Sequence, residues 1–427
     1  MRISMLPPAE VLVHFMNRIY GRGMTTTSGG NLSVRDEAGD LWITPGDIDK
    51  GSLRAEDIVR VDPSGKRHGI HEPSVELPFH RAIYAARPDV RAVVHAHSPA
   101  LVTFSVLGEV PDTGVFPRAA EVCGEVSVAP YALPGSARLG EHVAREFAVG
   151  RNAVLLANHG ATTAGATPAE AFLRFETLEF CCRLLIHSRR IGTPVSLPAA
   201  HRTTQRVAHA VAGPWDDYAP TTEEKELRQQ LTRFVRRAYG QSLFTSTEGA
   251  FGARCGDGRL VVTPHGVDRF YVEPEDFVAM RDGRAQGGRE PSWAWKLIQD
   301  ILDRQPALRA VIIAQPPYTM AFAVTGAPLT TPVIPESYVL LRDVPQLPFN
   351  AQVENPALVA STLSAEHPVI LIRNECTAVA GETLLKAFDR LEVTEFTAKA
   401  LVAAAGIGKP RELTEEQKEE IRRVFFR

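Results

Sequence analysis

The second half of this chain repeats sequence blocks of the first half. Residues 41–50, LWITPGDIDK, return at residues 260–269 as LVVTPHGVDR. Residues 87–95, RPDVRAVVH, return in the same order as QPALRAVII at residues 305–313. Several blocks repeated in one order indicate a duplicated folding unit, so the second half should adopt the fold of the first.

The length agrees with two domains, because 427 residues exceed what a single hydrophobic core usually holds. We expect two tandem copies, residues 1–215 and residues 216–427. The stretch from about 192 to 222 is rich in Pro, Ala and Thr, and we expect it to be the linker.

Within the first copy, short strands and helices alternate, which indicates an α/β fold. Several strands follow one another too closely for crossover helices, so we expect a mixed or antiparallel sheet. The expected strands lie near residues 32–35, 41–44, 58–61, 93–97 and 153–156. The expected helices lie near residues 9–20, 76–84, 137–147 and 168–190.

One strand of the first copy carries two histidines, His95 and His97, separated by a single residue. Side chains two positions apart on a strand point to the same face, so both imidazoles can approach one point. His159 follows another apolar strand, and Glu76 begins a helical pattern. Three imidazoles and one carboxylate could then serve one divalent cation.

The second copy has lost all four of these residues. They correspond to Ala294, Ile313, Gln315 and Glu375. Joint loss of the four residues suggests that they form one functional unit in the first copy. We therefore interpret the second copy as a degenerate, non-catalytic domain.

Composition excludes other classes of function. The net charge is −3 without basic blocks, so neither a nucleic acid nor a membrane surface is an expected partner. No stretch is apolar enough to span a bilayer, and residues 1–8 lack the apolar core of a signal peptide. The five cysteines show no metal-type spacing, so we expect reduced thiols and a cytoplasmic location.

These motifs together resemble the class II aldolase/adducin family, which includes fuculose phosphate aldolase. The resemblance is strong over about residues 8–190 and degenerate over 226–405. It rests on five short motifs, TSGGNLS at 27–33, ITP at 43–45, PSVE at 73–76, HAH at 95–97 and NHG at 158–160.

The resemblance implies a site and a fold. His95, His97 and His159 would bind a divalent metal, most often zinc, with manganese, cobalt or iron as alternatives. Glu76 would be the catalytic acid and base. The implied fold is a three-layer α/β/α sandwich around a largely antiparallel sheet. The family's C4 tetramers imply a homo-oligomer here, with two tandem chains forming a pseudo-tetramer.

The resemblance also implies a small-molecule substrate, and departures from the family pattern narrow it. Gly46 and Asp47 stand where sugar phosphate aldolases have a Thr-Gly pair, and Val75 replaces a serine. A carboxylate beside a phosphate dianion is repulsive, and valine removes a hydrogen-bond donor, so we expect an unphosphorylated hydroxy-carbonyl substrate. The expected substrate-binding residues are Ser28, Gly30, Asn31, Gly46, Asp47, Ser74 and Phe116.

Three functions stay open on this basis. The first is a metal-dependent carbon–carbon lyase of the aldolase type, in which the metal stabilises an enediolate. The second is a metal-dependent decarboxylase of a hydroxylated carboxylic acid. Phe116 falls where these aldolases place a proton-donating tyrosine, and decarboxylation needs no such donor. The third is an adducin-like interaction module without catalysis, which retention of the four residues disfavours.

Overall fold

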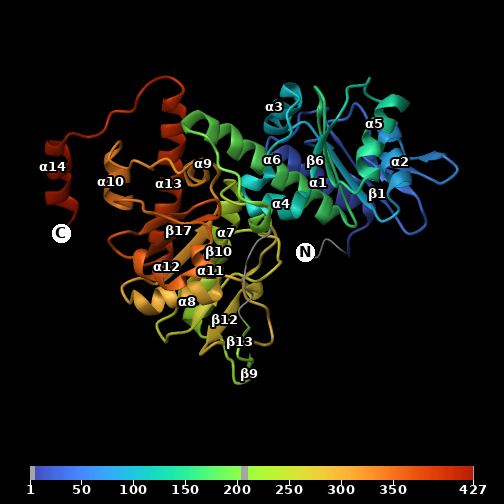
Figure 1. Cartoon of the computed structure of the whole chain (residues 1–427). Helices are drawn as coiled ribbons and strands as arrows, with labels where there is room; N and C mark the ends of the chain where they lie inside the picture. Colours follow the sequence, from blue (N-terminus) through green and yellow to red (C-terminus); the bar gives the residue numbers. More distant parts are fainter. Residues whose placement is uncertain (1–4, 203–209, 427) are drawn as a thin grey trace. The chain divides into compact units, whose positions relative to one another are not determined.

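The computed structural model describes residues 5–202 and 210–426 (Figure 1). Its contacts divide the chain into two compact units, residues 1–114 with 118–183, and residues 115–117 with 184–427. The expected boundary at residue 215 stays a prediction about where the domains separate. None of the described helices is long and apolar enough to cross a membrane.

The strands of the first unit form one sheet in the order β4-β3-β2-β1-β5-β8-β7-β6. Only β6 and β7 pair in parallel among the strands described there. The strands are β1 (Asn31–Arg35), β2 (Leu41–Ile43), β3 (Val59–Val61), β4 (Arg67–His68), β5 (Ala92–Ala96), β6 (Val126–Ala129), β7 (Ala153–Leu156) and β8 (Gly160–Gly165).

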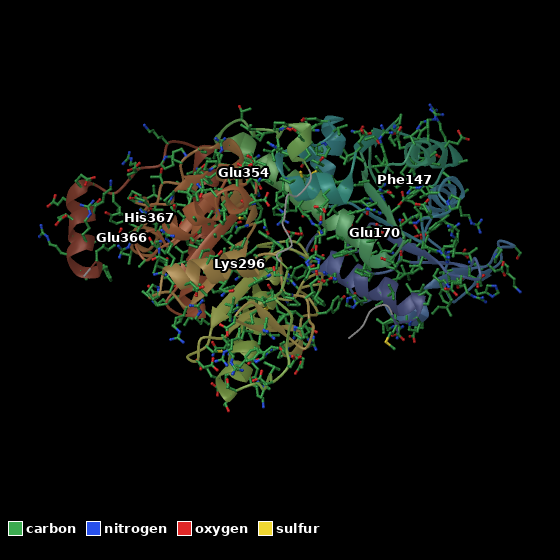
Figure 2. All side chains as sticks on the ribbon, turned by 60° about the horizontal axis from the view of Figure 1, so that its bottom comes forward. Phe147, Glu170, Lys296, Glu354, Glu366 and His367 are labelled. Atoms are coloured by element: carbon green, nitrogen blue, oxygen red, sulfur yellow. The ribbon has the colours of Figure 1, made fainter. Side chains whose placement is uncertain are left out.

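Helices cover this sheet on both faces (Figure 1). Helices α2 and α5 pack against each other over one face, and α1 and α3 contact the sheet as well. Phe147 of α5 is fully buried in the α2/α5 layer (Figure 2). The helices are α1 (Pro8–Gly21), α2 (Leu77–Ala86), α3 (Pro99–Leu107), α4 (Pro117–Cys123), α5 (Ala137–Ala148) and α6 (Pro168–Ile191), with 3-10 turns η2 (Ala55–Asp57) and η3 (Thr113–Val115). The 3-10 turn η4 (Ala199–His201) belongs to the second unit.

The second unit repeats this strand order and adds one short strand at the edge. Its order is β15-β16-β17-β14-β10-β11-β12-β13-β9, in which β9 pairs in parallel with β13. The strands are β9 (Pro214–Trp215), β10 (Ala250–Arg254), β11 (Leu260–Val262), β12 (Val278–Arg281), β13 (Arg284–Gln286), β14 (Ala310–Ala314), β15 (Gln346–Leu347), β16 (Val369–Ile372) and β17 (Cys376–Gly381).

Two apolar clusters lie on opposite faces of this second sheet. Alternate residues of β14 divide between them, since Val311 and Ile313 join the α8/α12 cluster while Ile312 joins the α7/α13 cluster. The helices are α7 (Thr222–Gly240), η5 (Pro274–Asp276), α8 (Trp295–Arg304), α9 (Pro317–Thr325), α10 (Pro335–Leu341), α11 (Ala351–Glu354), α12 (Pro356–Thr362), α13 (Leu384–Ala405) and α14 (Glu415–Phe425). The predicted three-layer, largely antiparallel α/β fold in two tandem copies is thereby confirmed.

Candidate metal centre

The first unit brings together the four residues that the sequence singled out. The nitrogen and oxygen atoms of Glu76, His95, His97 and His159 that could ligate an ion all lie within 4.8 Å of one another. They come from the end of β5, the start of α2 and the turn between β7 and β8. Among residues 5–202 and 210–426, this is the only such group of potential metal ligands.

Strand β8, which pairs with β5, fixes the tautomer of the first histidine. Nδ1 of His95 lies 3.0 Å from the carbonyl oxygen of Ala161 and 3.0 Å from Oγ1 of Thr162. A carbonyl oxygen can only accept, so Nδ1 carries the proton and Nε2 keeps its lone pair. That Nε2 atom lies 2.9 Å from Nε2 of His97. Two imidazole nitrogens directed at one point form a favourable site for a cation.

The turn before β8 presents the third histidine. Asn158 has a φ of +57°, in the left-handed region that asparagine tolerates. The backbone N–H groups of Asn158 and His159 donate to the carbonyl and hydroxyl oxygens of Ser105 on α3. These contacts hold the turn in a shape that directs His159 toward the other two rings.

Glycine at position 160 leaves room for the cluster. A Cβ atom on Gly160 would lie 2.7 Å from the carbonyl oxygen of Ala96 and 2.7 Å from Cδ2 of His97. A Cβ atom on Gly30, whose φ is +72°, would lie 2.8 Å from the carbonyl oxygen of His95. Both glycines therefore permit a close approach of backbone to the histidine strand.

The carboxylate of Glu76 completes the group from the start of α2. Its Oε2 accepts a hydrogen bond from Nδ2 of Asn31 at 2.7 Å and lies 3.3 Å from Nε2 of His95. Its Oε1 lies 3.4 Å from Nε2 of His159 and has no hydrogen-bond partner among the described residues. Burial raises the pKa of Glu76, while the bond from Asn31 opposes that shift.

Burial also keeps the histidines neutral. It lowers the pKa of His97 to about 4, with a contribution from His159, and it lowers the pKa of His159. The pKa of His95 lies well below its usual value for the same reason. Three neutral imidazoles and a buried carboxylate oxygen without a hydrogen bond are a donor set that fits a divalent ion such as zinc.

The predicted substrate-binding residues divide into two groups. Gly30, Asn31 and Ser74 are buried in the first unit, where Oγ of Ser74 accepts a hydrogen bond from the backbone of Glu76. Of the other four, Ser28 and Asp47 are exposed and Gly46 is partly exposed. Phe116 is buried and belongs to the second unit.

The sequence did not reveal what surrounds Asn31. Its Oδ1 lies 2.5 Å from Nε2 of His80 on α2, and Nδ1 of His80 lies 2.7 Å from Oγ of Ser33. A signal was available in the repeat, because His80 corresponds to Ile298 and Asn31 to Ala250.

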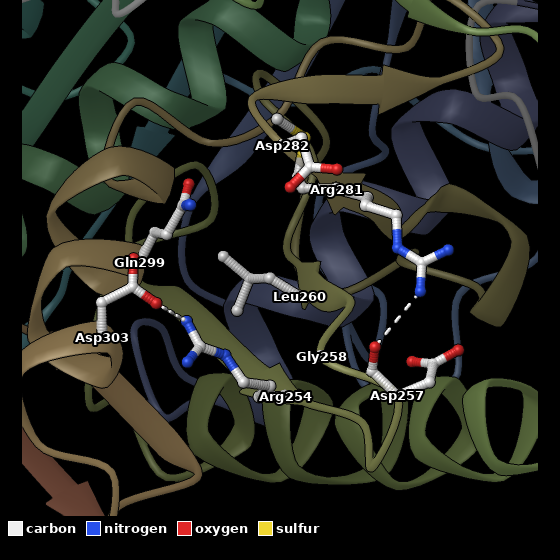
Figure 3. A pocket seen from close by; sticks show the side chains of 9 residues that line it. Arg254, Asp257, Gly258, Leu260, Arg281, Asp282, Gln299 and Asp303 are labelled. Atoms are coloured by element: carbon white, nitrogen blue, oxygen red, sulfur yellow. Dashed lines mark hydrogen bonds and ion pairs between the residues drawn. The ribbon is translucent and has the colours of Figure 1, made fainter.

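A hollow of about 300 Å³ in the second unit does not form a comparable centre. Figure 3 shows Arg254 directed at Asp303 and Arg281 directed at Asp257, with donor–acceptor distances of 2.5 Å and 3.2 Å. Both guanidinium groups already have acceptors, and the hollow lies outside the unit that carries the histidines.

Comparison with known proteins places both halves in one class. The family described as "Class II Aldolase and Adducin N-terminal domain" matches residues 10–186 and again residues 229–402. The two matches together account for most of the chain and coincide with the repeated unit.

Individual relatives match over one copy. A 5-deoxy-D-ribulose 1-phosphate aldolase of Bacillus thuringiensis serovar kurstaki is 34% identical over 44% of this chain and 89% of its own length. A 3-oxo-tetronate 4-phosphate decarboxylase of Haemophilus influenzae is 33% identical over 42% of this chain and 87% of its length. A solved L-fuculose 1-phosphate aldolase is 32% identical over 46% of this chain and 92% of its own, with a TM-score of 0.43.

Proposed function

This chain belongs to the class II aldolase and adducin family, and on that premise we propose that its first unit is a metal-dependent carbon–carbon lyase. The observation that carries the proposal is the convergence of Glu76, His95, His97 and His159 within 4.8 Å. Relatives that are aldolases and decarboxylases support lyase activity as the general class.

The three histidines would hold the ion, and zinc is the metal that we propose. Neutral imidazoles contribute no negative charge, so a bound ion would keep its positive charge beside the substrate carbon that gains electrons when the bond breaks. The hydrogen bond from Nδ1 of His95 to the carbonyl oxygen of Ala161 fixes the orientation of the His95 ring before any ligand binds.

Glu76 would move the proton. Its Oε2 is occupied by Asn31, and its Oε1 has no hydrogen-bond partner among the described residues. A buried carboxylate with a raised pKa is a better base than an exposed one, because proton transfer is most efficient when the pKa approaches the working pH. Oε1 is therefore the atom that we assign to proton transfer.

For the substrate we propose an unphosphorylated hydroxy-carbonyl compound. The backbone N–H of Gly46 already donates to the carbonyl oxygen of Glu72 at 3.2 Å, so it offers no hydrogen bond to a phosphate. The next residue is the exposed carboxylate of Asp47, and Val75 beside Glu76 is 69% exposed. These features support a substrate without a phosphate group, whereas the names of both relatives specify phosphorylated compounds.

A second candidate function is decarboxylation of a hydroxylated carboxylic acid. The 33% identity to a decarboxylase favours it. Phenylalanine at position 116 favours it as well, because this side chain has no hydroxyl that could exchange a proton with the aldehyde oxygen in an aldol reaction. Decarboxylation uses the same positive charge and the same proton donor but releases carbon dioxide.

A substrate screen tests the proposal. The zinc-loaded full chain is incubated with unphosphorylated hydroxyketones and hydroxy acids and with their phosphate esters, and released aldehyde and carbon dioxide are measured. We expect release from an unphosphorylated compound, abolished by His97→Ala. Turnover of phosphate esters alone would contradict the proposed substrate class. A chain that takes up no metal and turns over none of the compounds would contradict the lyase assignment.

A further inference from the structure

A row of hydrogen-bonded side chains leads from Glu76 into the layer between α2 and β1. Asn31 donates to Glu76 at 2.7 Å, and His80 lies 2.5 Å from Asn31. Oγ of Ser33 lies 2.7 Å from His80 and 2.8 Å from the hydroxyl of Tyr84. All five residues are buried, with exposed fractions of 5% or less.

The direction of every bond in this row follows from its first member. An ionised carboxylate only accepts, so the amide nitrogen of Asn31 faces Glu76 and its oxygen faces His80. His80 must then carry its proton on Nε2 and accept at Nδ1 from the hydroxyl of Ser33. Ser33 in turn accepts from Tyr84. Each donor therefore points toward Glu76, and bonds aligned in this way strengthen one another.

Burial keeps the middle member in the form that this row requires. It lowers the pKa of His80 to about 3, so the ring is neutral and has one donor and one acceptor. A neutral ring with a fixed tautomer holds the amide of Asn31 in one of its two flip states.

The second unit offers an internal control, because it has the same fold without the row. The equivalent residues are Ala250, Gly252, Ala294, Ile298 and Leu302. Four of them belong to one apolar core cluster on α8 and β10. A Cβ atom on Gly252 would lie 2.6 Å from Cγ2 of Ile298, so the glycine and the isoleucine fit each other as a pair. The fold does not need the polar row, whereas the row and the metal residues are absent together.

We propose that His80 is a positioning residue, which acts through Asn31 to hold the carboxylate of Glu76 in one orientation at the histidine cluster. Asn31 occupies Oε2, so that Oε1 stays directed at the place where the proton moves. The inference rests on the proposed function only in taking Glu76 as the group that moves the proton.

The tautomer of His80 tests the inference without a substrate. Long-range ¹H–¹⁵N spectra of the full chain labelled with ¹⁵N-histidine report it, and the signal that disappears in His80→Gln assigns the residue. We expect a neutral ring protonated at Nε2. A ring protonated at Nδ1 would reverse the row and overturn the inference.

Two matched variants test the effect on proton transfer. The amide nitrogen of glutamine in His80→Gln can replace Nε2 and donate to Asn31. The shorter His80→Asn can accept from Ser33 but does not reach Asn31. The probe is dihydroxyacetone in D₂O, where Glu76 removes a proton from the carbon beside the carbonyl and a deuteron returns to it. Hydrogen exchange at that carbon is followed by NMR in the zinc-loaded full chain.

We expect His80→Asn to slow the exchange about 10- to 100-fold with unchanged zinc content, and His80→Gln to recover most of the rate. Equal rates in both variants would overturn the inference, as would a loss of zinc that parallels the loss of rate. If the unaltered protein exchanges no hydrogen, proton transfer from a hydroxyketone, as we propose it for Glu76, is contradicted. The positioning role of His80 is then tested by the NMR measurement of its tautomer alone.

A variant that carries the equivalent residues of the second unit controls for the possibility that a loss of exchange reflects misfolding. Replacing Asn31, Ser33, His80 and Tyr84 by Ala, Gly, Ile and Leu reproduces an apolar packing that the same fold already contains. We expect this variant to fold, to bind zinc and to lose exchange by at least as much as His80→Asn. Full exchange in a folded, zinc-bound variant would contradict the inference.

Discussion

At the scale of single residues, the properties of the site depend on which side-chain atoms already form hydrogen bonds within the protein before any ligand binds. His95 donates from Nδ1 to Ala161 and Thr162, and Asn31 occupies one oxygen of Glu76. What remains directed at the centre is Nε2 of His95, the neighbouring rings and Oε1 of Glu76. The division that we propose between metal binding by the histidines and proton transfer by Glu76 rests on these contacts.

Glu76→Gln separates the two roles. The amide has the shape of the carboxyl group but cannot accept a proton at neutral pH, while the three histidines are unchanged. We expect dihydroxyacetone exchange to fall about 10²- to 10⁴-fold with retained zinc. Exchange at the unaltered rate would show that another group moves the proton.

Gly160→Ala tests the close approach beneath the cluster. The added Cβ would lie 2.7 Å from Cδ2 of His97 and from the carbonyl oxygen of Ala96, so His97 must shift. We expect zinc affinity, measured against a competing chelator, to fall about 10-fold or more. The control is Gly21→Ala at the end of α1, where a Cβ meets nothing within 4 Å. Unchanged affinity in Gly160→Ala would contradict the steric argument.

At the scale of elements, local pattern predicted five strands and four helices of the first copy but missed β4, β6, β8, α3 and α4, and it did not predict contacts between layers. The alternation of Val93 and His95 with Val94 predicted which side chains share a face of β5. The pairing of α2 with β1, which joins His80 to Asn31, depends on long-range packing and leaves no trace in either segment alone. Asn31 was predicted as a substrate ligand, and that role stays a prediction beside its observed bond to Glu76.

Helix α7 carries a buried ion-pair network that the first copy lacks. Glu224 is fully buried and accepts hydrogen bonds from Arg228 at 2.7 Å, Arg259 at 2.6 Å and the hydroxyl of Tyr218 at 2.5 Å. In the first copy, Met5 corresponds to Glu224, Ala9 to Arg228 and Asp40 to Arg259. The network therefore arose or persisted in the second copy alone.

Glu224→Ala should destabilise the second unit. It leaves the buried guanidinium group of Arg228 without a carboxylate and that of Arg259 with Asp257 alone. We expect the free energy of unfolding to fall by about 3 to 5 kcal/mol. Urea denaturation measures this change. The control is the exposed Glu226 on the same helix, whose replacement by alanine should change stability by less than about 0.5 kcal/mol. Equal effects of the two substitutions would contradict the structural role of the network.

At the scale of the whole molecule, duplication explains why one fold appears with and without a site. The strand order is the same in both units, apart from the added β9. The sequence predicted this architecture because several repeated blocks preserve their order. It could not predict how chains assemble, because no surface pattern in a single sequence identifies a symmetric partner.

Assembly is open to a direct measurement of mass. The family resemblance implies a ring of four domains, which two tandem chains would complete. We expect multi-angle light scattering of the purified full chain to give twice the chain mass of 46.7 kDa. A mass equal to one chain would rule out the pseudo-tetramer.

We expect the first unit to hold a metal ion and the second unit to hold none. Elemental analysis of the purified full chain after zinc loading and removal of unbound ion tests this expectation most directly. We predict one zinc ion per chain, reduced to none by His97→Ala with the fold retained. No bound metal, two ions per chain, or an ion retained by His97→Ala would contradict the account.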